Sequence, residues 1–352
     1  MAPGLASATW TAPWEAFRTW YGRFRARSSV AEQGTFNPRV LGSNPSGPST
    51  FDPRVGGRNR RWRAARLGPV DVLRSSSVAG FMDLAGEFLA AREAEHNLIF
   101  GICANLEADP SMSQGPPYLA TVLHGDRVVG AAIRTPPWRL VLSVMDHPGA
   151  AHRLVDDLMD EKLPGCVGPA MAAEHFAEGW TRVTGNPSRL STHERAFQLQ
   201  RVIPPRPAPG RMIRSDPSHQ GLIAAWAEAF DNEALEGGPS QDWDAVARRW
   251  IKGIGRTAYL WVDDGRVVSL TGVGGPTPHG IRVGPVYTPP EARRRGYASN
   301  LVAQVSQLQL DAGRQFVFLF TDLANPTSNK IYQDIGYEPV IEVDEYVFST
   351  PG

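Results

Sequence analysis

The sequence contains few cysteines, few lysines and no long apolar run. Its only cysteines are Cys103 and Cys166, and neither belongs to a CxxC or cysteine–histidine cluster of the kind that binds zinc. Nothing requires a disulfide between them, so we expect a reducing compartment, the cytoplasm, and no metal. No apolar segment reaches the roughly 18 residues that cross a bilayer. No compact apolar stretch follows basic residues at the N-terminus, as a secretory signal would require. We therefore expect no membrane partner.

The formal net charge at pH 7 is zero, which argues against a protein that binds nucleic acid over its whole surface. The charge is nevertheless uneven. The first 75 residues contain twelve arginines, no lysine and four acidic residues, so this segment carries +8 and the remainder −8. The chain has three lysines against 33 arginines, a bias typical of GC-rich coding. Arginine richness at the N-terminus is therefore weak evidence for a targeting peptide.

Residues 1–70 show no sustained apolar periodicity, and the stretch from Arg27 to Val55 is rich in turn-forming residues. This composition favours loop or disorder. One interpretation is a basic arm that contacts nucleic acid, and a second is a targeting peptide.

A third interpretation, which we favour, is that this segment is spurious. The run Ser28 to Pro38, followed by Gly42-Ser43-Asn44-Pro45, resembles the translation of a transfer-RNA gene. Gly-Ser-Asn-Pro can be encoded as GGT-TCG-AAT-CC, the sequence of a T-arm. The true start would then lie between about Val70 and Met82.

The remaining chain contains two halves with the same order of elements. An amphipathic helix is predicted over Phe81–Leu98 in the first half, and over Leu222–Phe230 in the second. A strand hairpin follows each helix, with turns at Gly125-Asp126 and Asp264-Gly265. The repeat predicts a duplicated α/β fold of the α+β type, with a mixed, mostly antiparallel central sheet flanked by helices. We assign one domain to residues 71–200, a proline-rich linker to 201–210, and a second domain to 211–352.

A strand, a basic turn and a helix follow one another in the second half. The strand Gly280–Tyr287 ends before Pro289-Pro290, and the turn Arg293–Gly296 leads into an apolar-faced helix. Backbone N–H groups in the first turn of a helix lack partners, and the helix dipole is positive there. Arginines at that end are unfavourable unless an anion binds. The turn is therefore predicted to bind phosphate.

The string Arg293-x-x-Gly296-x-Ala298 resembles the R/Q-x-x-G-x-G/A loop of the GNAT superfamily of N-acetyltransferases. A buried-strand run over 315–321 and a segment from Asn325 to Tyr337 follow, and the latter is similar to the second signature of the family. The resemblance covers about 211–348 and implies that the loop binds the pyrophosphate of acetyl-coenzyme A. The implied cofactor-binding residues are Val286, Tyr287, Arg293, Arg294, Arg295, Gly296, Tyr297, Ala298 and Asn325.

The resemblance also implies roles in acyl transfer. Tyr332 occupies the position where the family often places the tyrosine that protonates the departing thiolate, and a phenol can donate that proton at neutral pH. The alternative is a half-buried core tyrosine. Asn325 precedes Pro326 and would cap a helix. The N–H groups near Val286 and Tyr287 could polarise the thioester carbonyl. The acceptor-side candidates, each of which could instead be a solvated acid, are Glu228, Asp231 and Glu233.

The first half, residues 71–200, resembles a degenerate GNAT-like domain without a working cofactor loop, since Asp146 to His152 contains no Arg-x-x-Gly-x-Gly. We expect it to shape the acceptor site or a subunit contact.

The predicted function is N-acyl transfer from acetyl-coenzyme A to a primary amine of a small molecule or peptide, by direct attack. The alternatives are an acyl-coenzyme A sensor or pseudoenzyme of the same fold, and a nucleic-acid binder. A homodimer stays open. His279, near a glycine-rich turn, is expected to be exposed.

Overall fold

The computed structural model describes residues 70–234 and 239–349. The segment resembling a translated transfer-RNA gene lies outside the described residues. The described chain begins with an edge strand, β1 (Val70–Arg74), which pairs antiparallel with β2 (Tyr118–His124). A start as late as Met82 would remove β1 together with Phe81, whose side chain is fully buried.

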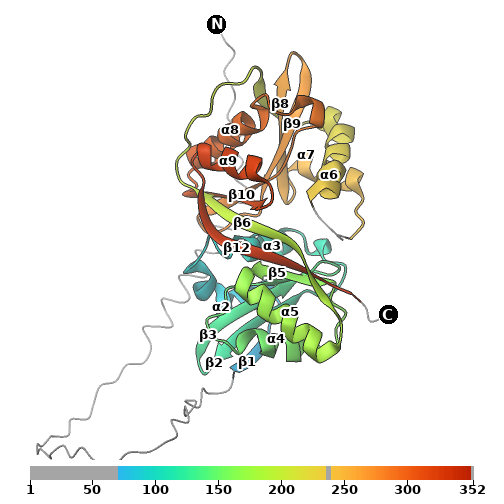
Figure 1. The fold of residues 1–352 in the computed structure, drawn as a ribbon, viewed down its shortest axis with the longest axis vertical. Helices are drawn as coiled ribbons and strands as arrows, with labels where there is room; N and C mark the ends of the chain where they lie inside the picture. Colours follow the sequence, from blue (N-terminus) through green and yellow to red (C-terminus); the bar gives the residue numbers. More distant parts are fainter. Residues whose placement is uncertain (1–69, 235–238, 350–352) are drawn as a thin grey trace, which may run out of the picture.

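One twelve-stranded sheet runs through the described residues in the order β1-β2-β3-β4-β5-β12-β6-β11-β10-β9-β8-β7 (Figure 1). Nine of its eleven neighbouring pairs are antiparallel, and the other two, β4–β5 and β10–β11, are short parallel stretches. The first half contributes α2 (Val78–Ala90), α3 (Asn97–Ala108), β3 (Arg127–Arg134), β4 (Leu140–Leu142), α4 (Ala150–Leu158), β5 (Gly165–Pro169), α5 (Ala170–Thr184) and β6 (Ser188–Leu199).

The second half repeats this order after a segment, between Leu199 and Arg211, without helix or strand. Its elements are β7 (Arg211–Arg214), α6 (Gln220–Ala234), α7 (Trp243–Lys252), β8 (Arg256–Asp263), β9 (Arg266–Gly274), β10 (Gly280–Tyr287), α8 (Tyr297–Asp311), β11 (Phe316–Asp322), α9 (Pro326–Asp334) and β12 (Glu338–Phe348).

The two halves exchange their last strands. β12, the end of the second half, pairs antiparallel with β5 of the first half, whereas β6 of the first half pairs with β11 of the second. β6 and β12 also pair with each other, from Ser188–Phe348 at one end to Gln198–Glu338 at the other. The sheet is therefore continuous across the junction, where these two strands cross between the upper and lower lobes (Figure 1).

Helices cover both faces of the sheet in each half. In the second half, α8 packs Leu301 and Val305 against Val283 and Leu319 on one face. The helices α6 and α7 cover the other face, where they bury a smaller cluster around Leu260. Central strands are buried in continuous runs, such as Val129–Ile133 of β3 and Ser269–Gly274 of β9, so successive side chains supply both faces.

The single helix predicted over Phe81–Leu98 is wrong in its second part. α2 ends at Ala90 and α3 begins at Asn97, with turns between them. His96 explains the break, because its buried ring bonds to two backbone groups. Its Nδ1 lies 2.9 Å from the carbonyl oxygen of Leu89, and the N–H of Val144 donates to its Nε2 over 3.1 Å.

Both cysteines are buried and free. Within residues 70–234 and 239–349, no helix is long and apolar enough to cross a membrane, and no cluster of three or more histidine, cysteine or acidic residues could hold a metal ion.

Candidate functional site

The strands β10 and β11 pair at one end only and then separate. Their parallel register covers Gly280–Phe316 to Arg282–Phe318 and goes no further. Beyond it, β10 has an irregularity in its pairing with β9 between Val283 and Val286. The edge of β10 that faces β11 is therefore unpaired over its second half. This opening lies beside a cavity of about 1270 Å³.

The N-terminus of α8 stands at one end of this cavity. Gly296 is its N-cap with φ of 79°, and no side chain caps the helix. The first intrahelical bond runs from the N–H of Asn300 to the carbonyl of Gly296 over 3.1 Å. The N–H groups of Tyr297, Ala298 and Ser299 come before this bond and have no partner within the helix. Because all three residues line the cavity, this end suits an anion.

Arg293 and Arg294 line the same cavity, but Arg295 does not. Arg295 lies by the hydroxyl of Tyr297, and that hydroxyl donates to Asp263 over 2.6 Å. The ring of Tyr297 is packed in the core against α8's neighbours. Of the two residues Arg295 and Tyr297, only Tyr297 is therefore placed to contact a ligand in the cavity, and it would do so through its backbone.

Arg293 connects the basic turn to α6. Its Nη2 lies 2.7 Å from a carboxylate oxygen of Glu233, and its Nε donates to the carbonyl of Thr288 over 2.8 Å. The guanidinium also stands 6.0 Å from the ring centre of Tyr287. The predicted cofactor turn and one predicted acceptor-side acid thus meet directly at the cavity wall.

The predicted acyl-transfer residues also line the cavity. Tyr332 is 8% exposed, and burial raises its pKa to about 12, so its phenol stays protonated at neutral pH. Asn325 accepts the N–H of Ser328 over 3.0 Å and caps α9, as its position before Pro326 predicts. The strand residues Val286 and Tyr287 are also in the lining.

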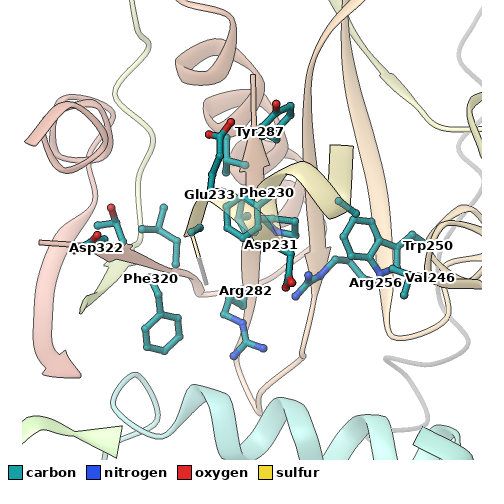
Figure 2. A pocket seen from close by; sticks show the side chains of 18 of the residues that line it. Phe230, Asp231, Glu233, Val246, Trp250, Arg256, Arg282, Tyr287, Phe320 and Asp322 are labelled. Carbon is teal, nitrogen blue, oxygen red and sulfur yellow. The ribbon is translucent and has the colours of Figure 1, made fainter. Parts of the chain in front are cut away.

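The acceptor-side candidates separate into two groups. Asp231 and Glu233 line the cavity, whereas Glu228 is exposed and is not part of the lining. Desolvation by burial raises the pKa of Asp231. Figure 2 shows Asp231 and Phe230 projecting from α6 toward the space beside β10.

Sequence reasoning missed Glu194, Arg256 and Arg282, which also line the cavity. Glu194 lies on β6, opposite Asp322 in the antiparallel register. Burial, followed by the charges of Glu345 and Asp322, raises the pKa of Glu194 to about 7, against the lowering effect of Arg282. The only sequence signal for Glu194 would have been the alternation along β6, a strand contributed by the first half.

His279 is not simply exposed, as the sequence suggested. Its Nδ1 lies 2.7 Å from a carboxylate oxygen of Glu93, and its backbone N–H donates to the same carboxylate over 2.8 Å. Glu93 belongs to the turn segment between α2 and α3, so this contact joins the two halves.

The corresponding turn of the first half has a different conformation. Gly149 precedes α4 with φ of −83°, in contrast to the left-handed Gly296. Asp146 pairs with Arg92 over 2.9 Å. An acidic residue therefore stands in the turn where the second half has arginines, so this turn does not suit a phosphate.

Comparisons with known proteins agree with this fold. Residues 277–347 match the family model described as FR47-like protein. No curated protein matches the chain. Among solved structures, a GCN5-related N-acetyltransferase from Sphaerobacter thermophilus is 17% identical with a TM-score of 0.53, over 80% of this chain and 96% of that one.

Two further structures are similar over most of the chain. A tandem GNAT protein from the clavulanic acid biosynthesis pathway is 15% identical with a TM-score of 0.51, over 81% of this chain and all of that one. A Drosophila protein is 15% identical with a TM-score of 0.57, over 80% and 98%. The chain thus has the GNAT fold, in two tandem copies, as the sequence predicted.

Proposed function

We propose that this protein is an N-acyltransferase that moves an acetyl group from acetyl-coenzyme A to a primary amine in the cytoplasm. The supporting observation is one cavity with an uncapped helix N-terminus at one end and a protonated, buried phenol in its wall. The residues fit acetyl-coenzyme A, because the free N–H groups of α8 and the arginines Arg293 and Arg294 suit its pyrophosphate. The unpaired edge of β10 suits its amide-containing arm.

Each step then has a group in the cavity wall. The turn and α8 anchor the cofactor, and the N–H groups near Val286 and Tyr287 polarise the thioester carbonyl. The amine attacks the carbonyl carbon, and the carbon–sulfur bond breaks. Tyr332 donates its proton to the departing thiolate. The carboxylate of Glu194 accepts the proton that the amine loses. Holding both reactants in one cavity supplies much of the rate.

The test is release of free coenzyme A thiol from acetyl-coenzyme A, measured against a panel of amines, amino acids, aminoglycosides and peptides. We expect release with at least one acceptor class. The double variant Arg293→Ala/Arg294→Ala should raise KM for acetyl-coenzyme A by roughly 10- to 100-fold, because each substitution removes a charged hydrogen bond to the cofactor. Arg295→Ala, which lies outside the cavity, is the matched control and should change KM little.

Tight cofactor binding with no thiol release across the whole panel would contradict the proposal. That result would indicate an acyl-coenzyme A sensor of the same fold. Equal KM values for the double variant and the Arg295→Ala control would show that the turn does not hold the cofactor.

A further inference from the structure

Two arginines stand on the sheet face opposite α8. Arg256 begins β8 and Arg282 lies in β10, and each is paired in register with Gly274 of β9, from its two sides. Glycine at position 272 leaves room for one of them, because a Cβ there would lie 2.3 Å from Cδ of Arg256. The two cations therefore lie on one face of the sheet, over the glycines of β9, which have no side chains. Figure 2 shows both directed into the space beside the strands.

Within residues 70–234 and 239–349, Arg256 has no salt bridge to a carboxylate. Burial, followed by the charge of Arg282, lowers its pKa to about 9. Its Nε lacks a hydrogen-bond partner among the described residues. Its guanidinium lies 5.2 Å from the ring centre of Trp250, a contact that does not neutralise its charge. The side chain keeps some accessible surface, and it lines the cavity.

Arg282 is similarly placed. Burial lowers its pKa to about 10, and Glu194 is the carboxylate that opposes this effect. Its Nη1 donates to the side-chain oxygen of Asn97 over 3.2 Å, and its guanidinium stands 5.8 Å from the ring centre of Phe320. These partners leave most of its five donors for another group.

Three other carboxylates of the cavity wall have cations of their own. Glu233 pairs with Arg293, Asp242 lies 3.9 Å from Arg248, and Glu345 pairs with Arg139 over 2.9 Å. Two half-buried guanidinium groups without a salt bridge in the described chain are costly unless an anion joins them. Their shared face is the side of β10 away from α8, and both side chains line the cavity.

We propose that Arg256 and Arg282 together bind an anionic group of the acceptor, so that the acceptor is a small amine carrying a carboxylate or a phosphate. This inference rests on the proposed acyl transfer. The planar guanidinium can hold two oxygens of one anionic group, and the rings of Trp250 and Phe320 lie beside the two guanidinium groups. Asp231 and Glu194 lie in the same cavity, where they suit the ammonium end of such a molecule.

The experiment compares acids with matched neutral amines in the thiol-release assay. Glycine, β-alanine and γ-aminobutyrate are tested against their carboxamides, and phosphoethanolamine against ethanolamine, with wild type, Arg256→Gln, Arg256→Lys and Arg295→Gln. We expect kcat/KM to be roughly 10- to 100-fold higher for the best acid than for its neutral counterpart. The carboxylate and phosphate arms decide which anion is bound.

Arg256→Gln should remove that preference, Arg256→Lys should restore part of it, and Arg295→Gln should keep it. A second readout is the thermal stabilisation of the protein by the same acids without acetyl-coenzyme A. This readout does not require turnover, so it still tests the anion site if Arg256→Gln is poorly active. The comparison of acids with amides in the wild type does not depend on any variant.

Thiol release that is equally fast with neutral amines and unaffected by Arg256→Gln would overturn the anion site and leave acyl transfer intact. Stabilisation by acids that depends on Arg256, with no thiol release from any amine, would support the anion site and contradict the proposed enzyme.

Discussion

At the scale of single residues, the cavity wall combines a phenol that is held protonated with a carboxyl that titrates near neutrality. Tyr332 and Glu194 come from different halves of the chain, on α9 and β6. Burial raises both pKa values, since it disfavours the ionised form of each group. A proton donor and a proton acceptor can therefore coexist in one cavity at pH 7.

Tyr332→Phe removes the proposed proton donor and keeps the ring. We expect kcat to fall about 100-fold with KM for acetyl-coenzyme A nearly unchanged, because general acid catalysis contributes on this order. Steady-state kinetics of thiol release measure both values. Tyr337→Phe is the control, since its hydroxyl bonds to Ser306 over 2.8 Å in the core, away from the cavity wall. An unchanged kcat in Tyr332→Phe would remove this tyrosine from the mechanism.

Glu194 predicts a pH dependence of the rate. Because its pKa is about 7, the fraction of Glu194 in the carboxylate form, which accepts a proton, increases as the pH rises through neutrality. The charged groups around it are Glu345, Asp322 and Arg282. We expect kcat at saturating acceptor to rise with an apparent pKa near 7 in wild type. Glu194→Gln should lower kcat about 100-fold and lose that rise. A variant that keeps the same profile would assign the titration to another group.

At the scale of elements, His96 joins the end of α2 to the segment after β4. Its neutral ring donates to Leu89 through Nδ1 and accepts from Val144 through Nε2. Burial is the largest cause of the lowering of its pKa to about 4. Protonation would remove the acceptor, so this link between two elements requires the neutral ring.

The stability of the fold should therefore fall in acid. The folded pKa of His96 is depressed, so the unfolded chain binds more protons between about pH 6.5 and 4, and stability is lost as pH falls through that window. A shift of this size corresponds to about 3 kcal/mol. Urea unfolding at pH 7 and 4.5 should show this loss in wild type and a smaller one in His96→Gln. His175→Gln, on the exposed face of α5, should behave as wild type.

The sequence predicted best those elements that local patterns define. The hairpins around Gly125 and Gly265, the basic turn and α8 all follow from alternation, turn residues and helix periodicity. The strands β5, β6 and β12 were not predicted, because each pairs with a strand of the other half and no local pattern states a pairing across the chain. Arg256 and Arg282 were missed for the same reason, since only register places both beside Gly274.

At the scale of the whole molecule, the exchange of β6 and β12 makes the two halves dependent on each other. β11 has no neighbour on that side except β6, and β5 none except β12. Either half alone would leave open edges and lose half of its central pairing. The fold should consequently unfold as one cooperative unit despite its tandem plan.

Splitting the chain within the linker 201–210 tests this dependence. We expect residues 70–200 and 211–352 to be insoluble or unfolded when expressed alone. When they are expressed together, a tag on one half should retain the other, because each completes the sheet of its partner. Circular dichroism and co-purification measure the two outcomes. Two halves that fold separately, each with a cooperative transition, would contradict the prediction.

The position of β12 also has a consequence for synthesis on the ribosome. This strand is the last of the twelve to be made, yet it lies in the middle of the sheet between β5 and β6. Until translation reaches it, both of its neighbours present unpaired edges. The nascent chain must therefore wait in an incomplete, aggregation-prone state. A premature stop before residue 338 would remove β12 and leave the facing edges of β5 and β6 unpaired.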